Sequence, residues 1–233
     1  MALLVGATLA SPRGVTEQPA VWTHYGRAGT ARLGNWGGLG FYRIKRIRGP
    51  TFYDLRILGI FIRDETLATV RYKASRKFDP FPRFYKFTIA SMRHSSASNL
   101  TIRYHYNQGV GAFLFDVPTT HLTLELALSY DMSDYLNDTR KTSYLKGALF
   151  WDVDIGQSAV ALDLEYFRQI SDIVPGETEL TRYELSAELN VPLYDRTLVT
   201  VGYEEEFYLF PGIRNVRSIY MAVGFKLLLP LTF

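Results

Sequence analysis

Apolar residues occupy alternate positions along the end of the chain, from Ile219 to Phe233. The interleaved positions are small or polar, as at Ser218, Ala222 and Gly224. A two-residue period places the two sets of side chains on opposite faces of a β-strand. The pattern therefore predicts a terminal strand with one continuous apolar face.

The same alternation recurs through the rest of the chain. Going upstream, it is found in residues 199–203, 183–191, 160–166, 145–153, 122–130, 100–114, 85–89, 68–72 and 55–61. The run that starts at Leu100 keeps its parity as far as Leu114, which indicates one strand of about 17 residues. Strands of soluble proteins are usually shorter, whereas a tilted strand of a membrane barrel spans about 9 to 11 residues and can project beyond the bilayer.

The expected number of strands follows from this alternation and from the even strand number of bacterial barrels. Counting from about Ala31 to the end of the chain, which includes one strand upstream of residue 55, gives eleven strands, but bacterial single-chain barrels have an even number. We expect a twelfth strand within Gln18–Ala28, or ten strands if Arg63–Thr66 is not a reversal. The predicted fold is all-β, a single antiparallel transmembrane β-barrel of 12 strands with 10 as the alternative, over residues 18–233.

Residues 1–17 are expected to form an N-terminal segment, either periplasmic or a plug. Within it, Ala2–Ala10 resembles the apolar core of a secretory signal but lacks the preceding Lys or Arg. We therefore interpret it as the start of the mature chain or as an ordered N-terminal segment.

The connections between the predicted strands alternate in length. Residues 116–120, 154–158 and 192–196 make short connections, whereas 132–142 and 170–179 are longer and polar. Outer-membrane barrels have short periplasmic turns and longer external loops. This asymmetry predicts a periplasmic C-terminus and external loops around Asp134, Asp138, Glu177 and Pro211.

Composition excludes several classes of structure and site. No run approaches the roughly 18 apolar residues of a spanning helix, and a closed barrel is the other structure that satisfies its backbone inside a bilayer. Cysteine is absent, which excludes disulfides, thiolate metal sites and a thiol nucleophile. A soluble β-sandwich with a binding role remains an alternative, because the mean hydropathy is close to zero.

The chain ends on an aromatic residue that closes the apolar face of the last strand. This face resembles the C-terminal signal by which outer-membrane barrels are recognised by the barrel assembly machinery. The residues concerned are Phe225, Leu227, Leu229, Leu231 and Phe233.

The stretch from Arg83 to Phe225 resembles a family of salt-induced outer-membrane proteins that is known mainly as a domain of unknown function. The resemblance rests on the order of short motifs: residues 109–115 (GVGAFLF), 122–130, 134–135, 184–185, 191–193 and 224–225. It implies a β-barrel in the outer membrane of a Gram-negative-type bacterium and no established catalytic residues.

Charge divides the chain into two halves. Residues 1–116 contain 17 Lys and Arg against 6 Asp and Glu, and residues 117–233 contain 9 against 17. If the apolar positions face lipid, the lumen has a basic wall formed by Arg71, Lys73, Lys86, Arg93 and Arg103. The opposite, acidic wall is formed by Glu125, Asp152, Asp163, Glu165, Glu184, Glu188, Glu204 and Glu206.

Two opposed walls of this kind either plug the lumen with ion pairs or create a transverse field that orients dipolar solutes. We favour the plugged form, because a bore of ten to twelve strands lies between a filled eight-stranded barrel and an open porin. Lys146 and Glu165 are expected to be neighbours inside. The cations Arg71, Lys73, Lys86 and Arg103 are expected to meet Glu184, Glu188, Glu204 and Glu206.

An outer-membrane lipid-modifying enzyme would need a nucleophile beside one of the histidines His24, His94, His105 and His121. His94 precedes Ser95, but neighbours on a strand point to opposite faces, so these two side chains are not expected to share a proton. His105 is expected opposite Asp131, and a His–Asp pair without a nucleophile favours a structural role. The run Arg43–Arg48 (RIKRIR) favours a strand end among charged head groups over nucleic-acid binding.

No phosphate-binding loop, dinucleotide motif or metal-ligand spacing is present in the sequence. We therefore expect no enzymatic activity, no cofactor and no metal. The expected partners are outer-membrane lipids, lipopolysaccharide and the assembly machinery, with a protein partner not identifiable. The sequence predicts a narrow or occluded pore, or a structural barrel that binds a partner.

Overall fold

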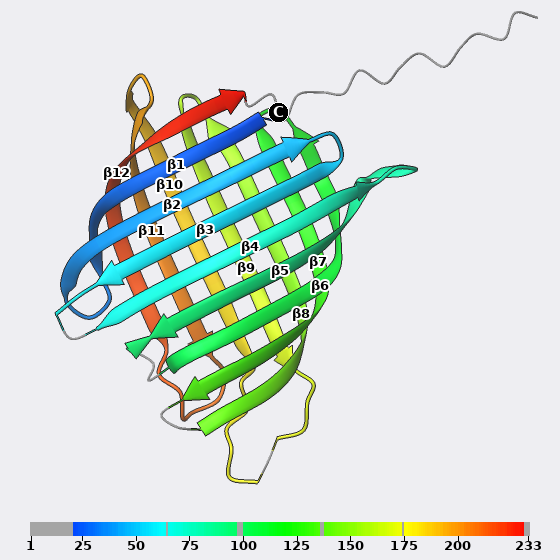
Figure 1. Ribbon diagram of the computed structural model, residues 1–233, viewed down its shortest axis with the longest axis vertical. Helices are drawn as coiled ribbons and strands as arrows, with labels where there is room; N and C mark the ends of the chain where they lie inside the picture. The colour runs from blue at the N-terminus through cyan, green and yellow to red at the C-terminus, as the bar shows by residue number, and fades with distance from the viewer. Residues whose placement is uncertain (1–20, 64, 97–99, 136–137, 174, 231–233) are drawn as a thin grey trace, which may run out of the picture.

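The computed structural model describes residues 21–63, 65–96, 100–135, 138–173 and 175–230, which form a closed barrel of antiparallel strands (Figure 1). The twelve strands are β1 (Val21–Arg32), β2 (Trp36–Arg48), β3 (Thr51–Phe61), β4 (Thr66–Phe78), β5 (Phe81–Ser95), β6 (Leu100–Val117), β7 (Thr120–Tyr135), β8 (Asp138–Ile155), β9 (Ser158–Gln169), β10 (Arg182–Tyr194), β11 (Thr197–Tyr208) and β12 (Val216–Pro230). The prediction of twelve strands is confirmed.

Each strand pairs with its neighbours in the sequence, and β1 pairs with β12 to close the barrel. The expected twelfth strand is β1, and the segment Arg63–Thr66 does contain a reversal, because β3 and β4 pair on either side of it. At the closing seam the backbones approach closely. A Cβ atom on Gly29 would collide with the backbone oxygen of Met221, so this position requires glycine.

The outer surface is apolar along most of the strands. Of the side chains expected to face lipid, Leu124, Leu126, Leu164, Leu185, Val223 and Phe225 are exposed and Leu162 is half-buried. The alternate positions carry the polar residues of the interior, as at Glu125 and Glu165. Two-residue periodicity thus gives each strand a lipid-facing side and a lumen-facing side.

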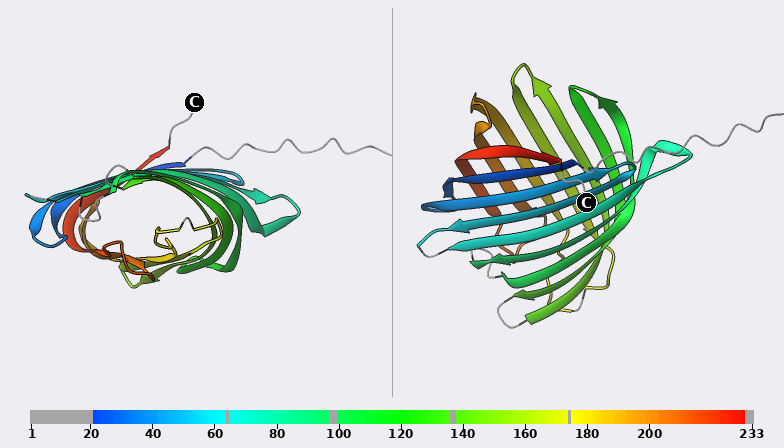
Figure 2. Two further views of the ribbon diagram at one scale, coloured as in Figure 1. Left: turned by 90° about the horizontal axis from the view of Figure 1, so that it is seen from below. Right: turned by 45° about the horizontal axis from the view of Figure 1, so that its top comes forward.

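The connections differ at the two ends of the barrel. We call the end with the two-residue connections at 49–50, 79–80, 118–119, 156–157 and 195–196 the turn end, and the opposite end the loop end. The longest connection, residues 170–181, joins β9 to β10 and crosses the outline of the loop end (yellow in Figure 2, left). The expected long connection at 132–142 was wrong, because β7 and β8 remain paired up to Tyr135 and Asp138.

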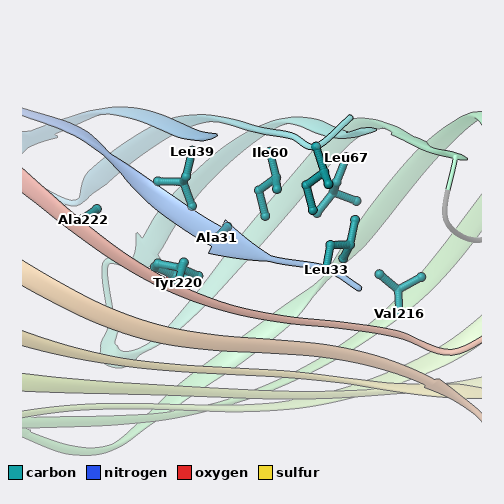
Figure 3. Packing of buried hydrophobic residues seen from close by; sticks show 9 residues of the cluster. Ala31, Leu33, Leu39, Ile60, Leu67, Val216, Tyr220 and Ala222 are labelled. Atoms are coloured by element: carbon teal, nitrogen blue, oxygen red, sulfur yellow. The ribbon is translucent and has the colours of Figure 1, made fainter. Parts of the chain in front are cut away.

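Apolar side chains fill one side of the interior towards the loop end. Figure 3 shows Ala31, Leu39, Ile60, Leu67 and Tyr220 pointing inward from β1, β2, β3, β4 and β12. A second cluster joins Tyr144, Phe167, Leu180 and Tyr208 at the loop end. The interior is therefore packed at this end.

No helix in the described part of the chain is long and apolar enough to cross a membrane. Three predictions concern residues outside the described ranges: the N-terminal segment 1–17, and Leu231 and Phe233 of the assembly signal. Phe225 of that signal lies on the exposed outer face of β12, and Leu227 is half-buried.

Candidate functional site

The lumen contains a cavity of about 660 Å³ that reaches the turn end, where Gly49, Pro50 and Thr51 line it. Towards the loop end its lining includes Arg93 and Glu206. Cations from β2, β3 and β4 line one side, and carboxylates from β8 to β11 line the other. The cavity therefore lies between a mainly basic and a mainly acidic wall.

Ion pairs cross the middle of this cavity. Arg71 on β4 donates to Glu165 on β9 across 3.0 Å, and Glu165 also pairs with Lys146 of the adjacent strand β8. Lys73 on β4 pairs with Glu125 on β7, which accepts a hydrogen bond from Tyr85 at 2.7 Å. Because these pairs join strands far apart in the barrel, they tie its two walls together.

A second group of charges lies on the β2–β3 side of the cavity. Arg43 donates to both carboxylate oxygens of Asp54 at 2.7 Å, and Arg56 donates to the same residue at 2.9 Å. Arg56 also reaches Asp163 on β9 at 3.7 Å. Asp54 therefore holds two arginines on the basic wall, one of which extends across the lumen.

Glu188 on β10 forms a third bridge. It accepts hydrogen bonds from Arg27 on β1 at 2.8 Å and from Tyr220 on β12 at 2.6 Å. Strands β11 and β12 separate β10 from β1 around the barrel. Glu188 thus bridges the seam region from the inside.

The loop-end half of the lumen contains a charge network shielded from water. Glu206 lies 2.7 Å from Arg103, 3.1 Å from Arg93 and 3.4 Å from Arg182. Asp131 lies 3.3 Å from Arg182 and pairs with His105. Arg103, Arg182, Asp131 and Glu206 each expose 4% or less of their side chains.

Aromatic rings enclose this network. The Arg182 guanidinium lies 4.3 Å from the ring centroid of Phe167 and 4.9 Å from that of Tyr144. Cation–π contacts gain strength when the cation is desolvated. Arg103, Asp131 and Arg182 are not among the residues that line the cavity. Towards the loop end the cavity therefore stops at a packed layer of paired charges and rings.

One residue of the predicted basic wall is misplaced. Lys86 lies on the exposed outer face of β5, because Tyr85, Phe87 and Ile89 are the residues that point inward there. Lys86 and Arg93 are seven positions apart, so an unbroken strand places them on opposite faces. Arg93 points inward and pairs with Glu206. The expectation that Lys86 lines the lumen was wrong.

The remaining predicted wall residues lie on the lumen side of their strands. Arg71, Lys73, Arg93, Asp152, Asp163, Glu165, Glu184, Glu188, Glu204 and Glu206 line the cavity, Glu125 is buried against Lys73, and Arg103 belongs to the loop-end network. The partners differ from those expected. Of the four expected cations, Arg103 alone pairs with one of the four expected carboxylates among the described residues, namely Glu206.

Several charged residues of the lumen were not assigned to it from the sequence: Arg27, Arg43, Asp54, Arg56 and Arg182. Their parity relative to the outward Tyr42, Ile57 and Tyr183 was the available signal. Three charged groups that line the cavity form no ion pair with any other described residue: Lys45, Asp152 and Glu204. These three side chains are therefore not held by an ion pair within the described residues.

Two of the predicted histidines contact neighbouring groups of the barrel. His105 and Asp131 lie opposite each other, as the sequence predicted, but Asp131 also contacts Arg182. His94 donates from Nδ1 to the backbone oxygen of Thr101 at 2.7 Å. No group of His, Asp or Glu suited to a metal ion is found among the described residues.

Solved structures with a similar fold include outer-membrane porins and channels. A structure of the NanC porin matches with a TM-score of 0.59 at 10% identity, covering 88% of this chain and 100% of that one. The COG4313 outer membrane channel from Pseudomonas putida F1 matches at 0.52 and 7%, covering 94% and 100%. The KdgM porin in complex with disordered oligogalacturonate matches at 0.50 and 13%, covering 87% and 98%.

No curated protein sequence matches this chain. The model of a protein family described as "Protein of unknown function, DUF481" matches residues 63–208, which is more than half of the chain. Together with the twelve-stranded fold, this match agrees with the predicted outer-membrane β-barrel. The chain belongs to the DUF481 family and has the β-barrel fold of outer-membrane porins.

Proposed function

We propose that this protein is a non-enzymatic pore that is narrow and closed at the loop end, with a polar cavity that opens at the turn end. The observation that carries the proposal is the network formed by Arg103, Arg182, Asp131 and Glu206 between the cavity and the loop end. In the proposed orientation the turn end faces the periplasm.

The physical basis for closure is the cost of separating buried charges. Removing one member of a buried ion pair costs about 3 to 5 kcal/mol, because the other charge is left without a partner. A hydrated ion that passed this layer would have to displace several such contacts. Passage therefore requires the network to rearrange, which a resting barrel does rarely.

The cavity favours solutes that carry both signs of charge or a strong dipole. Lys45 lies on the basic wall, whereas Asp152 and Glu204 lie on the acidic one. Opposed walls orient dipolar molecules and repel neither of their ends. The KdgM porin has been solved with the acidic polymer oligogalacturonate. For the present chain we propose dipolar solutes instead, because carboxylates line one whole side of its cavity.

Single-channel recording in planar bilayers tests this function. We expect little conductance from the unmodified protein and larger, more frequent openings from Arg103→Ser with Glu206→Ser, which removes one ion pair of the closing layer. The matched control is Arg217→Ser with Glu205→Ser, because Arg217 and Glu205 pair at 2.7 Å and alternate along β12 and β11 with the inward residues Ser218 and Glu206.

Heat-modified migration on gels verifies that each variant is folded. An unmodified protein that conducts as an open porin would contradict the proposed closure. Equal conductance of the folded lumen variant and the control would contradict the role of the network.

A further inference from the structure

The basic run at residues 43–48 is divided between the two faces of β2. Arg43 and Lys45 line the cavity, whereas Arg46 and Arg48 alternate with them and lie on the outer surface. A barrel surface that faces lipid normally excludes charge, except near the bilayer interfaces. The outward arginines therefore mark a boundary of the apolar band.

Two further cations extend this boundary onto the neighbouring strands. Arg48 is in register with Thr51 of β3, Thr51 with Arg76 of β4, and Arg76 with Lys86 of β5. Arg48 and Arg76 are thus two strand spacings apart, about 10 Å. The hairpins β2–β3 and β4–β5 lie beside each other in Figure 1. The four cations form one patch on the outer surface near the turn end.

Aromatic rings border the patch on its apolar side. The Arg46 guanidinium lies 5.4 Å from the ring of Trp22 and 5.7 Å from the ring of Tyr53. Tyr53 stacks on Tyr72 with centroids 6.4 Å apart. Trp and Tyr are typical of the interface between the hydrocarbon core and the head groups. The patch therefore lies at the depth of lipid head groups.

Little in the described protein neutralises Arg46, Arg76 and Lys86. Arg76 contacts Asp79 at 3.7 Å, but both side chains are more than half exposed, so the pair is weak. Lys86 forms no ion pair with a described residue, and Nε of Arg46 is buried without a described hydrogen-bond partner. Arginine and lysine at this depth are suited to phosphate oxygens.

We propose that Arg46, Arg48, Arg76 and Lys86 form a binding site for the phosphate group of an anionic phospholipid in the leaflet that borders the turn end. The flanking rings contact the acyl chains next to the head group. The site is separate from the lumen, so it does not depend on whether the pore is open or closed.

Native mass spectrometry with defined lipids tests the site. The protein in detergent is titrated with phosphatidylglycerol, with phosphatidylcholine of the same chain length, and with purified lipopolysaccharide. We expect phosphatidylglycerol to bind more tightly than phosphatidylcholine. Arg46→Gln with Arg76→Gln should weaken that binding by about 10- to 30-fold, because each basic residue near a lipid surface contributes about 1 kcal/mol.

The matched control is Lys141→Gln with Arg168→Gln. It removes the same charge from the outer face nearer the loop end, since these residues are in register with the exposed Met132 and Leu145. The control should bind phosphatidylglycerol as the unmodified protein does. Equal binding of the two phospholipids, or equal losses in variant and control, would overturn the site. Tighter, arginine-dependent binding of lipopolysaccharide would overturn the assignment to phospholipid.

Discussion

The two halves of the lumen use the same charged residue types but differ in their contact with water. In the turn-end half, Arg71 and Lys73 expose 23% and 17% of their side chains to the cavity. In the loop-end half, Arg103 and Arg182 expose 4% and 1%. The cations of the turn-end half can therefore exchange a protein partner for water. The cations of the loop-end half cannot.

This difference separates two roles for lumen charge. An ion pair with one partner open to the cavity sets the field that a solute meets, and it contributes less stability than a fully desolvated pair. A desolvated pair is costly to disrupt and holds the strands in one arrangement. The turn-end half is therefore suited to receive a solute, and the loop-end half is suited to keep the pore closed.

The largest expected effect comes from removing a cation of the closed half. Arg182→Met should destabilise the barrel by about 3 to 5 kcal/mol, because Asp131 loses one buried partner and Glu206 loses another. Arg71→Met in the cavity should cost less, about 1 to 3 kcal/mol, since Glu165 alone loses a partner and keeps its pair with Lys146. Urea refolding into lipid vesicles measures both, and equal losses would abolish the distinction between the halves.

A smaller effect is expected for a charge placed on the lipid face. Leu126 is 54% exposed on the outer surface of β7, so Leu126→Arg should cost about 2 to 4 kcal/mol in the same refolding measurement. Thr123 is three positions away and lines the cavity, so Thr123→Arg is the control and should cost less. A reversed order would show that the two faces of β7 are wrongly assigned.

The smallest effect concerns two glutamates on the same wall. Glu188→Gln should cost about 1 to 3 kcal/mol, because Arg27 loses its buried carboxylate partner. Glu204 has no ion pair with a described residue, so Glu204→Gln should change stability by less than about 0.5 kcal/mol. If the lumen conducts, the double variant should shift its selectivity towards anions. Equal stability losses would show that the pair at Glu188 contributes nothing.

Much of the fold could be predicted from the sequence, because two-residue alternation encodes both the strand and the face of each residue. The strand around Leu126 and the reversal between β3 and β4 are examples. The prediction failed where alternation was ambiguous. Both faces of β5 contain apolar residues, and the inward face is identified by Tyr85, whose hydroxyl group reaches Glu125 on another strand. The sequence of β5 alone does not predict that contact.

The charged lumen could be predicted as a set of residues but not as a set of pairs. Parity identifies which residues point inward, whereas pairing depends on the stagger and diameter of the closed barrel. Arg71 meets Glu165 rather than a residue of β10 or β11 for this reason. The division of the lumen into a hydrated and a desolvated half depends on Phe167 and Leu180, which pack at the loop end, and residue type gives no signal for it.

The absence of cysteine from the sequence permits a direct test of this division by labelling of single cysteines. Ser75 lines the cavity, whereas Ser129 points inward beside Asp131 and exposes 3% of its surface. In oriented vesicles, a membrane-impermeant maleimide should label Ser75→Cys from the turn end alone and should label Ser129→Cys from neither end. Rapid labelling of Ser129→Cys, or labelling of Ser75→Cys from the loop end, would contradict a lumen closed at the loop end.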